Sequence, residues 1–375
     1  MSHVDHHLAA KLKERTIAGN LRQLTTNRAS VDFFSNDYLG LATTGALAVM
    51  MTPSEKNSPG STGSRLLSGN SILAEELEQT IATFHRAEAA LLFNSGYDAN
   101  IGLLSSIAAR DTTILSDELC HASLIDGIRL SVSNHKYKFR HNDLQDLEDK
   151  LVRHTQKSTA IVVVESVYSM DGDTAPLVDL VRLCEKHGAQ LIVDEAHATG
   201  VVGANGAGAV CAAGLQGSVF ARVHTFGKAM GCHGAAVVGS PLLKQYLINF
   251  ARTFIYTTAL PAHSLDAIQS AYKYLSSDGF TNESLHQLIA FFRSRIATYS
   301  NGWKDSYTAI QALVVGENER CKKLASTLQR AGLQVNPILH PTVPLGMERL
   351  RVCLHTFNSK DEVNLLFEIL QQHPA

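Results

Sequence analysis

The chain has 375 residues, of which 45% are hydrophobic and 18% are charged, and it contains 26 glycines and 9 prolines. This composition is typical of a globular protein with two or three folding units, and it excludes disordered and fibrous proteins. The net charge is −2 and the longest basic run is the pair Lys322 and Lys323, which argues against a protein dedicated to binding DNA or RNA.

The cysteines and the apolar segments predict a soluble, cytoplasmic protein. The six cysteines form no C-x-x-C pair and no regular framework, so we expect reduced thiols and no metal site. Residues 1–16 lack the apolar core of a secretory signal. The longest uncharged stretch, residues 201–221, contains five glycines and is too polar to cross a membrane. We therefore expect neither a membrane nor a nucleic acid as a partner.

From residue 90 onward, short runs of β-branched residues alternate with amphipathic stretches, a pattern typical of βαβ units and a parallel sheet. Buried strands are predicted over residues 90–93, 112–115, 160–164, 190–193, 219–225 and 235–239. Helices are predicted over residues 98–109, 122–130, 143–152, 177–187 and 241–250. This alternation predicts an α/β fold.

After Pro261 the pattern changes to longer helices with fewer strands. Helices are predicted over residues 263–276, 282–299, 317–331 and 360–372, and strands over residues 309–315 and 348–355. This order predicts a smaller α+β unit. Near the N-terminus, a basic helix and a short strand at residues 31–34 are too little to fold alone. We therefore predict an N-terminal arm (1–42), a large domain (43–262) and a small C-terminal domain (263–375).

Three common catalytic or nucleotide-binding motifs are incomplete in this chain. A P-loop around Gly227 and Lys228 would require glycine and Ser/Thr where Arg222 and Ala229 stand. The glycines of residues 203–208 do not have the spacing of a dinucleotide fingerprint, and no G-x-S-x-G elbow is present. P-loop nucleotidases, Rossmann dehydrogenases and hydrolases of the elbow type are therefore disfavoured.

Four features at the ends of predicted strands together satisfy the needs of one cofactor. Lys228 follows the strand at 219–225, Asp194 ends the strand at 190–193, and His121 follows the strand at 112–115. The turn around Gly96 places backbone N–H groups at a helix N-terminus, where a phosphate can bind. Each feature alone is as well explained by a surface, cap or turn residue. Together they supply a Schiff-base lysine, an acid for a pyridine nitrogen, a stacking ring and a phosphate site, as pyridoxal phosphate requires.

Other polar residues near these strand ends have more than one possible role. His197 could orient Asp194 or reach the phenolic oxygen of the cofactor, and the hydroxyls of Ser169 and Thr225 suit a phosphate. Glu165 ends the strand at 160–164 and is either a substrate-side carboxylate or a charge exposed to water. The sequence leaves both interpretations of Glu165 open.

These residues belong to a set of motifs that extends over nearly the whole chain. The set consists of S-N-D-Y-L-G at 35–40, G-S-T-G-S-R at 60–65, A-L-L-F-N-S-G-Y at 90–97, S-M-D-G-D at 169–173, D-E-A-H at 194–197 and T-F-G-K at 225–228. In this order it resembles the α-oxoamine synthases, a family of fold type I pyridoxal phosphate enzymes. The resemblance implies a transferase with a large domain, built on a mostly parallel seven-stranded sheet between helices, and a smaller α+β C-terminal domain.

The resemblance also implies a role for each candidate residue. Lys228 would form the Schiff base, Asp194 would pair with the pyridine nitrogen, and His121 would stack on the ring as the third catalytic residue. Contacts with the phosphate or the phenolic oxygen are implied for Gly96, Tyr97, Ser169, His197 and Thr225. On the substrate side the resemblance implies Arg22, Asn36, Glu165, Thr342 and Arg351. Of these, Arg351 would hold the carboxylate of the amino acid with its planar guanidinium.

Residues 309–318 and 341–351 resemble the family members that condense L-alanine with a pimeloyl thioester, carried by coenzyme A or an acyl carrier protein. The implied assembly is a homodimer with its active site at the interface, where residues 256–258 would reach the cofactor of the partner. Three alternatives remain open: a sister enzyme that uses glycine or serine with another acyl thioester, a plain aminotransferase, and a catalytically silent binding protein of the same fold.

Overall fold

The computed structural model of the chain describes residues 2–24, 26, 29–51, 60–154, 159–299 and 302–373. The chain divides into two compact units. The large unit consists of residues 36–169 and 174–282, and the C-terminal unit consists of residues 1–35, 170–173 and 283–375. Within the described ranges, no helix combines the length and the apolar character needed to cross a bilayer.

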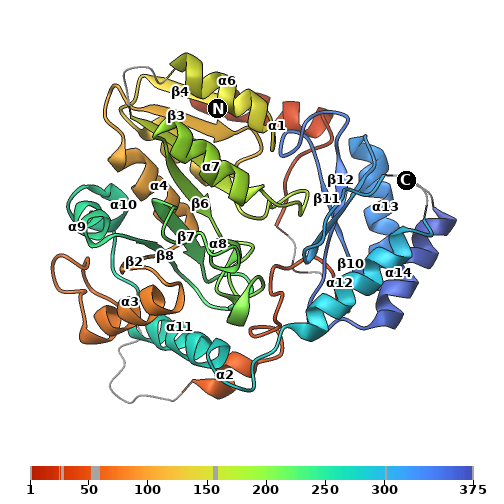
Figure 1. Ribbon diagram of the computed structural model, residues 1–375. Helices are drawn as coiled ribbons and strands as arrows, with labels where there is room; N and C mark the ends of the chain where they lie inside the picture. Colours follow the sequence, from red (N-terminus) through yellow and green to blue (C-terminus); the bar gives the residue numbers. More distant parts are fainter. Residues whose placement is uncertain are drawn as a thin grey trace. The chain divides into compact units, whose positions relative to one another are not determined.

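Seven strands form the central sheet of the large unit, in the order β2-β8-β7-β6-β5-β3-β4 (Figure 1). The strands are β2 Ala89–Phe93, β3 Thr113–Asp117, β4 His135–Phe139, β5 Ala160–Glu165, β6 Gln190–Asp194, β7 Ala221–Thr225 and β8 Ala235–Gly239. Strand β8 runs antiparallel to β2 and β7, and the other neighbouring pairs are parallel. The predicted mostly parallel seven-stranded sheet is confirmed.

Apolar residues cover both faces of this sheet because successive side chains of a strand point to opposite sides. In β5, Ile161 and Val163 pack into the core that contains residues of α4, α5 and α9. Val162 and Val164 pack into the opposite core, which contains residues of α6 and α7. The helices of the large unit are α2 Ala46–Met50, α3 Ile72–Phe84, α4 Gly96–Ile107, α5 Ala122–Leu130, α6 Leu144–His154, α7 Leu177–His187, α8 Ala209–Ala212, α9 Pro241–Phe250, α10 Arg252–Ile255, α11 Ala262–Leu275 and the 3₁₀ turn η1 Ala204–Gly206.

The carboxyl ends of four parallel strands carry polar residues, although the strands themselves are apolar. Strands β3, β5, β6 and β7 end at Asp117, Glu165, Asp194 and Thr225. Parallel strands bring these ends to one edge of the sheet, which is where open α/β sheets bind their ligands. The fold therefore gathers the polar side chains at a single edge.

The C-terminal unit contains a three-stranded antiparallel sheet in the order β11-β12-β9 and a two-stranded parallel pair of β1 and β10. Its elements are α1 His3–Ile17, β1 Val31–Asp32, α12 Glu283–Ile296, β9 Ile310–Val314, α13 Asn318–Arg330, β10 Leu333–Gln334, β11 Asn336–Ile338, β12 Arg349–Cys353 and α14 Lys360–Gln372. Residues 170–173 join this unit because the buried Arg349 pairs with Asp171, and the hydroxyls of Ser306 and Thr308 donate to the carbonyl of Gly172.

The observed division differs from the predicted one at 42/43 and 262/263. Residues 1–35 belong to the C-terminal unit because β1 pairs with β10, and the Cys353 N–H donates to the carbonyl of the fully buried Phe33. Helix α11 belongs to the large unit because Tyr272 packs edge-to-face on Phe84 and bonds His85. The last segment of the C-terminal unit therefore begins after Asn282.

Two fully buried histidines stack on each other in the large unit. The rings of His85, after α3, and His224, in β7, lie 3.6 Å apart between centroids. His85 Nδ1 must donate to the Ala207 carbonyl, so His85 Nε2 accepts the bond from the Tyr272 hydroxyl. One ring nitrogen of His85 thus donates and the other accepts, which is the pattern of a neutral imidazole. Burial, opposed by the Ala207 bond, lowers the pKa of His85 to about 3, and burial lowers the pKa of His224 well below its usual value.

These histidines should make the protein sensitive to acid. The unfolded chain binds protons near pH 6.5, whereas His85 stays neutral in the folded protein down to about pH 3. Stability is therefore full above pH 6.5 and falls as the pH drops towards 3, by up to about 5 kcal/mol for His85. We expect His85→Gln to reduce the slope of the unfolding free energy against pH in urea titrations. The exposed His135→Gln serves as the comparison, and an equal slope in both variants would contradict this assignment.

Candidate active site

The predicted lysine and the turn predicted to bind a phosphate both lie near the end of β7. Thr225 is the last residue of β7, and Lys228 lies three residues later, half-buried in the bend that leads to β8. Gly96 opens α4, whose N-cap Ser95 accepts from the Asp98 N–H. A Cβ on Gly96 would collide with the Thr225 hydroxyl. Only glycine therefore lets the N-terminus of α4 approach Thr225 this closely.

Asp194 is held at the end of β6 by two hydrogen bonds. Its Oδ1 accepts from the Ala196 N–H at 2.8 Å, and its Oδ2 accepts from Asn100 Nδ2 at 2.7 Å. The side chain is nearly buried and forms no ion pair within the described ranges. Both donors to the carboxylate are therefore neutral, so a cation could still pair with its negative charge.

His121 caps the N-terminus of α5 with its ring exposed. Its Nδ1 accepts from the Ser123 N–H at 3.2 Å and lies 2.8 Å from the Ser123 hydroxyl. Its backbone N–H donates to Glu165 Oε1 at 2.5 Å. Partial loss of solvent lowers the pKa of His121; the charge of Asp194 opposes this and the charge of Lys228 adds to it. His121 is therefore poised as a neutral imidazole next to both residues.

Glu165 links the residues at this edge. Its side chain is 3% exposed, so the alternative of a strand-end charge in water is wrong. Burial and the neighbouring Asp194 raise the pKa of Glu165 to about 8, while Lys228 and the His121 N–H oppose the increase. Both Asp194 and Lys228 thus act on Glu165 and on His121. The structure brings these four predicted residues together.

His197 is oriented by a residue to which the sequence assigned no role. The hydroxyl of Tyr38 lies 2.8 Å from His197 Nδ1, and it donates to Asn36 Oδ1 at 3.1 Å. Tyr38 is 1% exposed and His197 is 7% exposed. Asn36, predicted on the substrate side, therefore connects through Tyr38 to a predicted cofactor residue.

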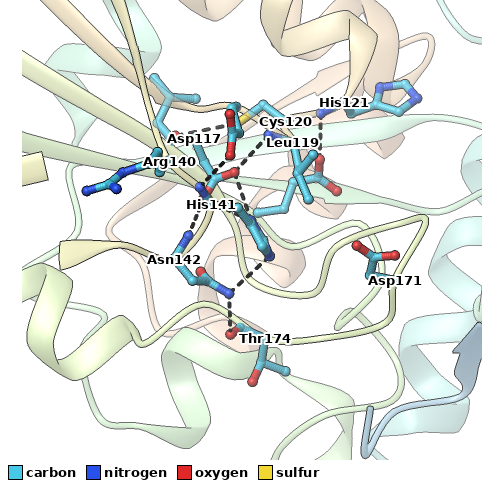
Figure 2. Close-up of polar contacts among 12 residues, drawn as sticks. Asp117, Leu119, Cys120, His121, Arg140, His141, Asn142, Asp171 and Thr174 are labelled. Atoms are coloured by element: carbon cyan, nitrogen blue, oxygen red, sulfur yellow. Dashed lines mark hydrogen bonds and ion pairs between the residues drawn. The ribbon is translucent and has the colours of Figure 1, made fainter. Parts of the chain in front are cut away.

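A second network supports the loops that carry His121 and Ser169. The side chains of Asp117 and His141 face each other, and Asn142 donates to the Thr174 carbonyl (Figure 2). Burial raises the pKa of Asp117, but the hydrogen bonds from His141 and the Asn142 and Leu119 N–H groups outweigh it and lower the pKa. Ser169 is nearly buried, and its N–H donates to Glu165.

Tyr97 and the segment 256–258, which were predicted to contact a cofactor, form hydrogen bonds with other residues of this chain. The exposed Tyr97 donates to Asp126 at 2.5 Å, and this hydrogen bond raises the pKa of its phenol. In the segment 256–258, the Thr257 hydroxyl and the Thr258 carbonyl accept from Asn94 Nδ2. Hydrogen bonds therefore hold this segment against Asn94, in the turn that precedes Gly96.

Three substrate-side candidates lie in the C-terminal unit. Arg22 Nη2 donates to the Thr342 hydroxyl at 3.3 Å, so the structure brings these two exposed residues together. Arg351 lies in β12, opposite Ala312 of β9, and is 6% exposed. The described residues contain no group of three or more His, Cys, Asp or Glu side chains arranged to hold a metal ion. All six cysteines are free thiols.

Comparison with known proteins agrees with this geometry. The model of the family "Aminotransferase class I and II" matches residues 29–367, so the chain belongs to that family. The 8-amino-7-oxononanoate synthase of Emericella nidulans is 42% identical over 368 residues, covering 91% of this chain and 89% of the relative. A putative 8-amino-7-oxononanoate synthase of Bacillus cereus is 40% identical, covering 92% and 91%. The predicted resemblance is confirmed.

Solved structures confirm the predicted fold class. A serine palmitoyltransferase from S. paucimobilis, with a bound PLP–myriocin adduct, matches with a TM-score of 0.91 at 26% identity and covers 100% of this chain and 98% of its own. The 8-amino-7-oxononanoate synthase from Francisella tularensis matches with a TM-score of 0.77 at 29% identity, covering 91% and 97%. Both identities exceed the level at which only a fold is shared.

Proposed function

We propose that this protein catalyses the decarboxylative condensation of L-alanine with a pimeloyl thioester, giving 8-amino-7-oxononanoate, CO2 and a free thiol in biotin biosynthesis. The observation that carries the proposal is that the charges of Lys228 and Asp194 both reach Glu165 and His121, which suits an amine and an acid that act on one bound cofactor. The names of the relatives that are 42% and 40% identical support the choice of substrates.

The residues of the large unit fit pyridoxal phosphate. The N-terminus of α4 at Gly96 and the Thr225 hydroxyl suit the phosphate, because they offer hydrogen-bond donors close to each other. Asp194 suits a protonated pyridine nitrogen, since its two hydrogen-bond donors, the Asn100 amide and the Ala196 N–H, are neutral and a cation would balance its charge. Lys228 is the amine, with Tyr97, Ser169 and His197 as further contacts.

Bound at these residues, pyridoxal phosphate supplies an aldehyde for the amino group of alanine and a ring that accepts the electron pair left at Cα. In this proposal Lys228 Nζ takes the proton from Cα of alanine and later returns one. Asp194 keeps a proton on the ring nitrogen. His121, which is neutral at pH 7, can donate from its ring to the acyl group, and Glu165 with its pKa near 8 adds no full negative charge beside Asp194.

On the substrate side, the planar guanidinium of Arg351 would bind the carboxylate of alanine with two donors. Arg22, Asn36 and Thr342 would be further substrate-binding residues. The carboxylate of alanine must stay bound until the bond between its Cα and the acyl carbon has formed, and only then leaves as CO2. A guanidinium suits this task because it binds a carboxylate without a covalent bond. We further propose a homodimer in which residues 256–258 reach the cofactor of the partner. A cytoplasmic location stays a prediction from the sequence.

One observation favours a second candidate, a synthase that uses serine. Serine palmitoyltransferase structures match with a TM-score of 0.91, compared with 0.77 for the oxononanoate synthase. The identities point the other way, because relatives named for the alanine reaction are 40% or more identical and the palmitoyltransferase is 26% identical. The backbone is shared by the whole fold class, whereas the higher residue identity favours the relatives named 8-amino-7-oxononanoate synthase, so alanine is the first choice.

The test is mass spectrometry of the product formed by the purified holoenzyme. We expect 8-amino-7-oxononanoate from L-alanine with pimeloyl-CoA or pimeloyl-acyl carrier protein, and much less product from glycine or serine with acetyl-CoA or palmitoyl-CoA. Product only from serine or glycine would replace the proposal by a sister reaction. Pyruvate from alanine without any thioester would indicate an aminotransferase, and no visible absorbance with pyridoxal phosphate would indicate a binding protein.

A further inference from the structure

Asn100 joins two of the proposed catalytic residues through one amide nitrogen. It lies in α4 and is 2% exposed. Its Nδ2 donates to Asp194 Oδ2 at 2.7 Å and to the Ser123 hydroxyl at 2.9 Å. A carboxylate oxygen only accepts, so the nitrogen and not the oxygen of the amide must face Asp194. Both hydrogens of the amide are therefore used.

The proton positions along this chain of hydrogen bonds follow from the Ser123 hydroxyl. Its oxygen accepts from Asn100, so its single hydrogen is free to point at His121 Nδ1, which lies 2.8 Å away. The Ser123 N–H also points at His121 Nδ1, at 3.2 Å. A nitrogen that accepts two hydrogen bonds carries no proton, so the neutral imidazole must carry its proton on Nε2.

We propose that Asn100 is a positioning residue that fixes the orientation of the Asp194 carboxylate and, by directing the Ser123 hydroxyl at His121 Nδ1, reinforces the His121 tautomer with its proton on Nε2. The Ala196 N–H and Asn100 hold one oxygen of Asp194 each, so the carboxylate plane cannot turn. Through the Ser123 hydroxyl the same amide adds to the Ser123 N–H in holding His121 as a donor on Nε2. The inference rests on the proposed cofactor but not on the proposed substrates.

Two alanine variants separate the effect on Asp194 from the effect on His121. Asn100→Ala removes the hydrogen bonds to Asp194 and to the Ser123 hydroxyl, whereas Ser123→Ala removes only the hydroxyl that links Asn100 to His121. We expect Asn100→Ala to raise the Kd of the apoprotein for pyridoxal phosphate by about 10- to 100-fold, followed by absorbance, as is usual when a partner that orients a ligand-binding group is lost. Ser123→Ala should leave this Kd unchanged, and the double variant should equal Asn100→Ala.

The second measurement follows the histidine itself in the apoprotein. Protein with ¹⁵N-labelled histidine, with the His121 signal identified by His121→Gln, should show the proton of His121 on Nε2 in the wild type. Donors to Nδ1 stabilise the neutral ring, so Ser123→Ala should raise the pKa of His121, and the double variant should raise it no further. The charged groups near this ring are Asp194, Asp126, Lys228 and Glu165, and neither variant removes them.

Asn282→Ala is the matched control, because its amide also donates within the large unit, to the Val201 carbonyl. It should change neither the Kd nor the titration. An unchanged Kd in Asn100→Ala would overturn the proposal, as would a wild-type His121 protonated on Nδ1, a measurement that needs no variant of Asn100 to fold. No acyl thioester enters either experiment, so failure of the proposed reaction and failure of this inference give different results.

Discussion

Lys228→Ala is expected to lose the visible absorbance that pyridoxal phosphate gives in the wild type and to lower kcat/KM by at least about 10³-fold. Alanine can neither hold the cofactor covalently nor move a proton at the amino acid Cα. The measurements are the absorption spectrum after addition of the cofactor, trapping of the covalent attachment with borohydride, and the rate of product formation. The half-buried position of Lys228 predicts that the variant folds, because the loss of one partly solvated side chain leaves no large cavity.

Two further variants separate the chemistry of Lys228 from its charge. Lys228→Arg keeps the positive charge beside Glu165 and His121 but cannot give up its proton, so it should be as inactive as the alanine variant. Lys186→Ala removes a lysine that pairs with Glu148 at the surface and should keep both absorbance and activity. Full activity in Lys228→Arg would mean that the residue acts only through its charge, and the proposed reaction would then lose its base.

The central strands could be predicted from the sequence because they are buried on both faces. Strands β5 and β6 read as unbroken apolar runs, and the sequence placed both within one residue of their observed ends. Strand β4, His135–Phe139, was not predicted, because it pairs only with β3 at the edge of the sheet and buries only Phe139. Edge strands carry a weak hydrophobic signal, and the contact that creates them is distant in the sequence.

The reacting groups of the candidate site could also be predicted, because each follows a strand that appears in the sequence as an apolar run. The residues that support these groups could not be predicted. Asn100 contacts Asp194 across 94 residues of sequence, and Tyr38 contacts His197 across 159. Asn100 lies within a helix and Tyr38 within a motif that resembled a family only as a whole. No local pattern marks a side chain whose role depends on a partner from a distant segment.

Asp194→Asn is expected to lower kcat by about 10²- to 10³-fold while the protein still binds pyridoxal phosphate. The amide has nearly the same shape, so its oxygen can keep the bond from the Ala196 N–H, whereas its nitrogen cannot accept the bond from Asn100. It has no negative charge to keep a proton on the ring nitrogen, and the ring then accepts electrons poorly. Burial and the charge of Asp194 together raise the pKa of Glu165, so the loss of that charge should lower this pKa from about 8.

The neighbouring buried acid offers a matched control for this exchange. Glu195 is fully buried and accepts from Ser166 and from the Ala209 and Val210 N–H groups. Glu195→Gln makes the same change from carboxylate to amide one residue away, so it should lower stability but leave kcat unchanged. Burial raises the pKa of Glu195, while the hydrogen bonds from Val210, Ala209 and Ser166 oppose the increase. Equal losses of kcat in both variants would mean that Asp194 acts through the packing of the strand end, and its pairing with the ring nitrogen would be wrong.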